Sequence, residues 1–202
     1  TGTATVTVNR KAVTVSGITA RNKVYDGKAN ATLDCSTARL DGVLENDTLT
    51  VTATGTFESA DVGEQKVIIS GFKLDGDSAA NYVPATKGSQ TETTATITAK
   101  EVTVAITPNG GTYGSVTTAA ATLSGAVDGE TVPVKLTYTG NGYNSTTVPT
   151  NAGSYTVTVS IADSNYVLTG ETTANFVIEP KSIKGAKVVL GKALTANGAE
   201  QT

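Results

Sequence analysis

The sequence contains no histidine, methionine or tryptophan, and it has one cysteine, Cys35, among its 202 residues. Without histidine and with a single thiol, it cannot form a Ser-His-Asp or Cys-His catalytic group, or a zinc site built from histidine and several cysteines. Because Cys35 has no partner for an intrachain disulfide, we expect a half-buried thiol that packs as a small apolar side chain. These absences exclude many nucleophilic and zinc-dependent enzymes.

Basic stretches and long apolar runs are also missing. The formal net charge is -3 and the sequence pI is near 5.0, and no basic run is interleaved with aromatic residues, so nucleic acid is not an expected partner. No apolar run approaches the roughly 20 residues that span a bilayer. The opening "TGTATVTVNR" lacks the apolar region of a signal peptide. We therefore expect no membrane insertion within these residues, and we expect any export signal or anchor to lie outside them.

The residues that are abundant, threonine and valine, indicate β-structure, because β-branched side chains fit a pleated surface better than a helix. Apolar residues alternate with polar ones in short segments, and turn signals such as Asp26-Gly27, Asp41-Gly42, Asp128-Gly129 and Asn141-Gly142 separate them. Such strands in 80 to 90 residues are typical of a sandwich of two antiparallel sheets, immunoglobulin-like in the broad sense. Val132, Val134 and Leu136 are among the residues expected to face a core.

The sequence repeats itself. "LDGVLENDTLTV" (40–51) matches "LSGAVDGETVPV" (123–134), "DVGEQKVIISG" (61–71) matches "NAGSYTVTVSI" (151–161), and "AANYV" (79–83) matches "DSNYV" (163–167), all in the same order. We therefore predict two related modules, the first over residues 11–99 and the second over residues 100–180. Residues 1–10 are expected to be the last strand of a preceding module, and residues 181–202 the start of a following one.

The ordered motifs resemble repeat modules of large bacterial surface proteins. The first module resembles the YDG family from about residue 13 to residue 99, through the tripeptide Tyr25-Asp26-Gly27. The second resembles the MBG family from about residue 101 to residue 180, through "TYG" (112–114), "TNAGSYTVTVSIADSNYV" (150–167) and "ANFVIEPK" (174–181). The resemblance implies tandem extracellular β-modules of adhesin-like or cell-wall proteins, with no catalytic residues or cofactor to carry over.

The tripeptide and its counterpart Tyr113-Gly114 predict a packed aromatic residue followed by a glycine that tolerates positive φ. The second module has no acid between its Tyr and Gly, so Asp26 is not a shared requirement. We expect Tyr25 with Gly27, and Tyr113 with Gly114, to be equivalent structural anchors near the start of each sandwich.

Three candidate sites compete with a purely structural interpretation. Asp75, Asp77 and Asn81 have spacings similar to a calcium loop, although the later ligand positions hold Ala79 and Thr86, and a solvated hairpin loop is the favoured alternative. Lys135 and Asn175 are a pair to test for an intramolecular isopeptide bond, although alternation with Val134 and Leu136 predicts that Lys135 faces solvent. No metal or other cofactor is otherwise expected.

Tyr143, flanked by Asn141 and Asn144 in the loop at residues 140–147, is the candidate sugar-binding platform, since exposed loop tips commonly carry binding residues. The alternative is a hairpin whose tyrosine covers the end of the sandwich. The acidic pairs Glu58 with Asp61 and Asp128 with Glu130 are interpreted as loop residues, because glycoside hydrolysis needs two carboxylates facing each other across a cleft. We expect no enzyme.

Taken together, the residues and the resemblance predict a structural spacer: tandem modules in the stalk of an extracellular protein at the bacterial cell surface or cell wall, contacting adjoining modules of the same chain. The alternative is a binding module whose loops recognise a glycan or a surface protein.

Overall fold

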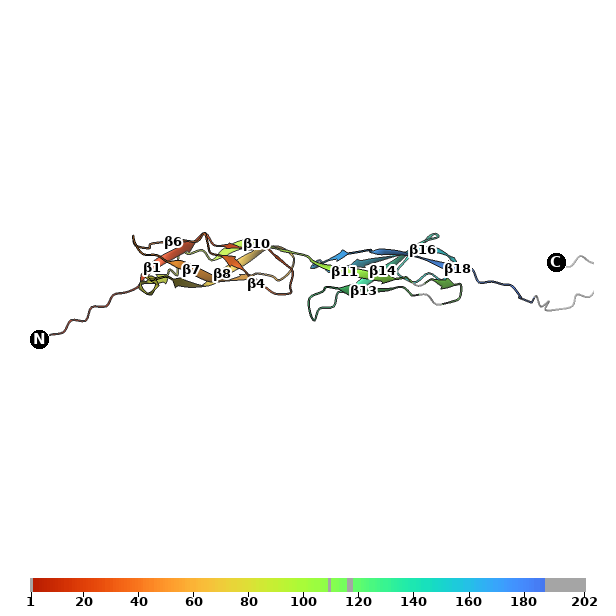
Figure 1. Cartoon of the computed structure of the whole chain (residues 1–202), viewed down its shortest axis with the longest axis horizontal. Helices are drawn as coiled ribbons and strands as arrows, with labels where there is room; N and C mark the ends of the chain where they lie inside the picture. Colours follow the sequence, from red (N-terminus) through yellow and green to blue (C-terminus); the bar gives the residue numbers. More distant parts are fainter. Residues whose placement is uncertain (1, 109, 116–117, 188–202) are drawn as a thin grey trace, which may run out of the picture. The chain divides into compact units, whose positions relative to one another are not determined.

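The computed structural model describes residues 2–108, 110–115 and 118–187. Strands account for nearly all regular structure in these ranges, and the only helical turn is η1 (Ala79–Asn81). Within the same ranges, no helix has the length and apolar character needed to cross a membrane. The predicted all-β fold of two tandem sandwich modules is therefore confirmed, and Figure 1 shows the strands in chain order from β1 to β18.

The first module consists of a three-stranded sheet, a five-stranded sheet and one short strand pair. The three-stranded sheet has the order β6 (Arg39–Asp41), β1 (Lys11–Ser16), β9 (Tyr82–Pro84). The five-stranded sheet has the order β3 (Lys23–Val24), β10 (Glu92–Thr98), β8 (Gly63–Asp75), β7 (Thr50–Phe57), β4 (Asn30–Ala31). The pair is β2 (Thr19–Ala20) with β5 (Leu33–Asp34).

The second module repeats the pattern of a three-stranded and a five-stranded sheet. Its smaller sheet has the order β13 (Ala120–Ser124), β11 (Lys100–Thr107), β17 (Tyr166–Thr169). Its larger sheet has the order β12 (Gly111–Thr112), β18 (Thr173–Glu179), β16 (Gly153–Ile161), β14 (Val134–Gly140), β15 (Tyr143–Ser145).

The registers show that the sequence repeat is also a structural repeat. β1 pairs in parallel with β9, Lys11 opposite Tyr82, and β11 pairs in parallel with β17, Lys100 opposite Tyr166. At the other end, β3 pairs in parallel with β10 and β12 with β18. The match of "AANYV" with "DSNYV" therefore places Tyr82 and Tyr166 at the same position of their modules.

Packing divides the chain into two compact units that do not coincide with the two modules. The first unit comprises Thr1–Ile106, Ala121–Lys135 and Val159–Thr172, and the second comprises Thr107–Ala120, Leu136–Thr158 and Thr173–Thr202. The first unit thus holds the first module together with three segments from the second, residues 100–106, 121–135 and 159–172. Packing between sequence-distant segments is what brings these residues into one unit.

Most residues predicted to face a core are buried, as the alternation requires. Examples are Val13, Val15, Val67, Ile97, Val102, Val157 and Ile178. The prediction is wrong at Val134, which is exposed at the first position of β14, while Leu136 is half-buried and Tyr138 is fully buried. Leu136 and Tyr138 lie on one face of β14. Burial on that face increases towards the end of the strand, where the buried Tyr138 lies.

The chain segments outside the sandwiches form no strand where the structure describes them. Residues 2–10 and 180–187 have no strand pairing and are exposed to solvent, so residues 2–10 contribute no edge strand here. A strand needs a hydrogen-bonded neighbour, and these residues have none in the described chain. Residues 188–202, predicted to continue into a following module, lie outside the described residues, and the predicted module boundaries stay a prediction.

Candidate functional site

Tyr25 lies in a cluster with Glu130 and Tyr166, all within the first unit. The Tyr25 hydroxyl donates to the Glu130 carboxylate, 3.1 Å from Oε1 and 3.2 Å from Oε2, and the Tyr166 hydroxyl donates to Oε2 at 2.6 Å. The two rings meet edge to face with centroids 5.4 Å apart, a favourable arrangement for aromatic pairs. Tyr25 is 8% exposed and Tyr166 is 4% exposed. One carboxylate thus joins Tyr25 to Tyr166, which are 141 positions apart in the sequence.

A tight loop places this carboxylate. The Glu130 amide donates to the Val127 carbonyl at 3.0 Å, and Gly129 supplies the positive φ of 84° that the turn requires. The Val127 amide donates to the Tyr166 hydroxyl oxygen at 3.1 Å. The Tyr166 hydroxyl therefore accepts from the loop backbone and donates to the loop's acid, which fixes the loop on the tyrosine.

Asn165, next to Tyr166, makes a second connection within the same unit. Its Oδ1 accepts from the Val62 amide at 2.9 Å, and its Nδ2 donates to Asp61 Oδ1 at 3.1 Å. Hydrogen bonds from Ser59 and then from Asn165 lower the pKa of the Asp61 carboxyl. The side-chain amide uses both its donor and its acceptor, so Asn165 fixes the loop before β8 in position.

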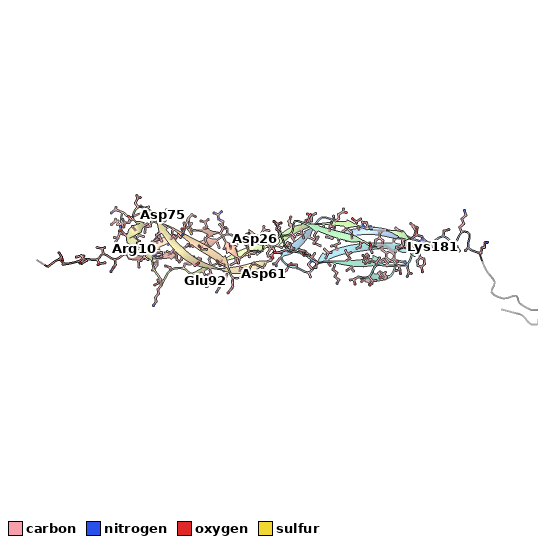
Figure 2. All side chains as sticks on the ribbon, turned by 90° about the horizontal axis from the view of Figure 1, so that it is seen from below. Arg10, Asp26, Asp61, Asp75, Glu92 and Lys181 are labelled. Atoms are coloured by element: carbon pink, nitrogen blue, oxygen red, sulfur yellow. The ribbon has the colours of Figure 1, made fainter. Side chains whose placement is uncertain are left out.

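We call Tyr25, Asp61 and Val62 the tail residues of the first module, and Val127, Glu130, Asn165 and Tyr166 the head residues of the second. Their contact is the joint. Figure 2 shows the labelled Asp26 and Asp61 at the same end of the first module, and Arg10 and Asp75 towards its other end. Apolar side chains fill the joint as well, because Phe57, Val67, Ile97 and Val102 belong to one buried cluster with both tyrosines.

Burial and the neighbouring carboxylate determine the titration of the joint. Desolvation first, and then the hydrogen bond to Glu130, raise the pKa of Tyr25 to about 12. The same two causes raise the pKa of Tyr166. Both phenols therefore stay protonated and keep donating to Glu130 at neutral pH.

The other residues of the Tyr25-Asp26-Gly27 tripeptide shape the turn. Asp26 Oδ1 accepts from the Lys23 ammonium at 2.6 Å and from the Lys28 amide at 3.0 Å. Burial works to raise the pKa of the Asp26 carboxyl, but these hydrogen bonds outweigh it and lower the pKa. Gly27 has a φ of 72°, and a β-carbon there would lie 2.8 Å from Glu130 Oε1. The acid closes the turn and the glycine leaves room for the head residues.

Tyr113 occupies the same backbone position in the second module but is packed differently. Its amide donates to the Glu179 carbonyl at 2.8 Å, just as the Tyr25 amide donates to the Thr98 carbonyl at 2.8 Å. Its side chain, however, is 50% exposed, and a β-carbon at Gly114 would meet nothing within 4 Å. The two tyrosines are equivalent in topology, but among the described residues only Tyr25 has a partner that buries it.

The first module also carries its own version of the head residues. The Tyr82 hydroxyl donates to Asp47, the Leu44 amide donates to the Tyr82 hydroxyl oxygen at 3.1 Å, and the Asp47 amide donates to the Leu44 carbonyl at 3.1 Å. This bonding repeats that of Tyr166, Glu130 and Val127 residue for residue. The head is therefore a shared element of both modules.

The predicted sugar platform is occupied by intramolecular contacts. Asn141 (φ 50°) and Gly142 (φ 74°) form the two-residue turn between β14 and β15, and Asn144 is exposed in β15. Tyr143 is half-buried, donates to the Thr147 carbonyl at 2.9 Å and meets the ring of Tyr155 edge to face at 6.1 Å. Its ring packs against the sandwich through Tyr155, as the hairpin alternative predicts.

The residues of the calcium and isopeptide candidates lie as follows. Asp75 ends β8 and accepts from the Gly76 amide at 2.9 Å, Asp77 lies in the following turn and Asn81 ends η1. Within the described ranges, no group of three or more His, Cys, Asp or Glu side chains is placed to hold a metal ion. Lys135 and Asn175 are both exposed, and Asn175 Oδ1 accepts from the Thr156 hydroxyl at 2.8 Å. Cys35 is a half-buried free thiol, as predicted.

Comparison with protein families gives a match to the YDG domain over residues 9–91 and to the MBG domain over residues 112–182. The chain is a YDG domain followed by an MBG domain. The joint therefore connects these two domains, with Tyr25, Asp61 and Val62 from the YDG domain and the four head residues from the MBG domain. No curated protein and no solved structure matches the chain.

Sequence reasoning found Tyr25 and Gly27 but missed their partners. Asp61 and Glu130 were considered only as members of two acidic pairs, whereas the structure uses each to join the YDG domain to the MBG domain. A usable signal existed, because the dipeptide Asn-Tyr occurs at 81–82 and again at 165–166, each following a loop that carries an acid at the matching position, Asp47 or Glu130. A polar pair repeated at equivalent places indicates a shared contact.

Proposed function

We propose that the YDG and MBG domains are non-enzymatic spacer modules of an extracellular protein at the bacterial cell surface, where they separate a functional part of the protein from its anchor. The observation that carries this proposal is the joint, in which one domain's carboxylate and asparagine are used to bind the neighbouring domain. One acid of each pair considered for glycoside hydrolysis, Asp61 or Glu130, is thereby engaged in the joint. Family membership in repeat modules of surface proteins supports the same role.

The strand topology suits a spacer that experiences tension. In the YDG domain the first strand, β1, pairs in parallel with β9, and the last strand, β10, pairs in parallel with β3. When the two ends of a domain are pulled apart, neighbouring parallel strands of this kind slide along each other, so their hydrogen bonds must break together. An antiparallel hairpin pulled at its open ends loses its bonds one by one. The MBG domain repeats both parallel pairs.

Force spectroscopy tests this role. Pulling the chain through its two ends should unfold the YDG domain at a higher force than pulling it through cysteines placed at Thr50 and Asp75. These residues pair at the open end of the β7–β8 hairpin, so its hydrogen bonds open one at a time. Cys35→Ser removes the native thiol in both cases, so only the direction of force differs. Equal unfolding forces in the two directions would remove the mechanical support for the proposal.

Binding of a glycan or surface protein is the competing function, and its best candidate residue is already engaged in contacts with Thr147 and Tyr155. A glycan array and a pull-down with the intact chain separate the two functions. The spacer role predicts no saturable binding. Saturable binding that is lost on Tyr143→Ala, with the fold retained, would replace the spacer proposal with a binding function.

A further inference from the structure

The second module ends in an exposed counterpart of the tail. Tyr113, Ala152 and residues 180–186 line a hollow of about 690 Å³ in the second unit. Tyr113 corresponds to Tyr25, and Ala152 corresponds to Val62, because each lies directly before the glycine that begins the matching strand, Gly153 or Gly63. We call Tyr113, Ala152 and Ile183 the open tail.

Burial separates the open tail from the joint at each matching position. Tyr25 is 8% exposed, whereas Tyr113 is 50% exposed. Ile183 corresponds to Val102, because each stands two residues after the lysine at a module junction, Lys181 or Lys100. Val102 is 0% exposed, whereas Ile183 is 84% exposed. Val62 packs against the buried cluster of the joint. A tyrosine and an isoleucine left this open at positions that are buried elsewhere in the same chain indicate a surface that lacks its partner.

The joint specifies what that partner would be. Against Tyr25 and Val62 it places a carboxylate that accepts from the tyrosine hydroxyl and an asparagine oxygen that accepts from a backbone amide. Tyr113 and the Ala152 amide present the same two donors. The head that supplies these acceptors recurs in both modules, with Asp47 and Tyr82 in the first and Glu130 and Tyr166 in the second. The chemistry that fits the open tail is therefore the head of another domain of this kind.

We infer that the open tail is a docking surface for the head of a further YDG- or MBG-type domain that follows in the same chain, with its first strand starting at Lys181. In the joint, Glu130, Asn165 and Tyr166 contact Tyr25 and Val62. The acid and the Asn-Tyr pair of the following domain contact Tyr113 and Ala152 in the same way. The inference rests on the proposed spacer function and adds to it a rule for how successive domains are joined.

The experiment adds a domain whose head is known. In the extended chain, residues 181–202 are replaced by a second copy of residues 100–202. The added Lys100 then stands in place of Lys181, and residues 1–180 are unchanged. Amide hydrogen exchange is then compared at Ala152 in the original and the extended chain. The added Asn165 should accept from the Ala152 amide and slow its exchange about tenfold, the range of one hydrogen bond.

The matched control uses the same substitution at two places. Asn165→Ala in the added copy should restore fast exchange at Ala152 and leave Val62 protected. Asn165→Ala in the original copy should speed exchange at Val62 and leave Ala152 protected. Tyr113→Ala should abolish the protection of Ala152 by the added domain.

Two results would overturn the inference. One is unchanged exchange at Ala152 although the core amides of the added domain show that it is folded. The other is protection of Ala152 in the original chain that rises with protein concentration, which would assign the surface to a second copy of the chain. Either result leaves the spacer function standing, since that function depends on the unfolding force and on the absence of saturable binding.

Discussion

Replacing Tyr25 and Tyr113 by alanine, one at a time, compares two tyrosines that share a backbone position and differ in burial. A fully covered tyrosine removes about 200 Å² from water, and at about 25 cal/mol per Å² that burial is worth about 5 kcal/mol. Tyr25 is 8% exposed and Tyr113 is 50% exposed. We therefore expect Tyr25→Ala to lower the free energy of unfolding by about 4.5 kcal/mol and Tyr113→Ala by about 2.5 kcal/mol.

Urea unfolding followed by circular dichroism measures both losses, and the absence of tryptophan makes a backbone signal the better choice. Tyr25→Ala should lower the urea midpoint of the first unit, which includes the head residues of the MBG domain. Tyr113→Ala should lower the urea midpoint of the second unit. Equal losses for the two variants would refute the reasoning, because they would mean that the head residues add nothing to the burial of Tyr25.

Three further predictions test parts of the joint. First, the pKa of Tyr25 is about 12 in the folded chain against an ordinary value of 10.0, so its stabilisation is complete below pH 10 and is lost as the pH rises towards 12. Tyr166 and Tyr82 also have raised pKa values, so phenolate absorbance should show several tyrosines titrating late, and their number should fall by one in Tyr25→Phe. Second, Gly27→Ala and Gly114→Ala both place alanine at positive φ, which costs about 1 kcal/mol of stability. Only Gly27→Ala pushes against Glu130, so it should cost about 1 kcal/mol more because the hydrogen bond to Glu130 is weakened. Equal losses of stability in thermal unfolding would contradict the contact between Gly27 and Glu130. Third, Asn165→Ala in the chain as it stands should speed hydrogen exchange of the Val62 amide about tenfold, and unchanged exchange would show that Asn165 does not hold that loop.

Local sequence patterns were sufficient for the modules but not for the joint. Alternation of β-branched residues and paired turn residues predicted the strands, and the ordered repeats predicted two related domains. The turn at Asn141-Gly142 follows from residues that adopt positive φ readily. These features depend on neighbours a few residues away, so a single sequence contains the information.

The partners of Tyr25 depend on residues 105 and 141 positions further along the chain, at Glu130 and Tyr166. Periodicity within one strand cannot report such a contact. For the same reason, the sequence could not distinguish Tyr25 from Tyr113, because the difference in burial comes from what packs against each ring. Val134 lies on the same face of β14 as Leu136 and Tyr138, but it is exposed because it stands at the first position of the strand, and alternation alone does not show where a strand leaves the core.

A double-mutant cycle on Tyr25→Phe and Glu130→Ala tests most directly whether the YDG and MBG domains are joined by a specific contact. The hydroxyl of Tyr25 lies within 3.1 to 3.2 Å of both carboxylate oxygens, so the two substitutions should be coupled by about 1 kcal/mol in the free energy of unfolding. Losses that add to within about 0.3 kcal/mol would show that the tyrosine and the carboxylate do not interact, and the account of the joint would then be wrong.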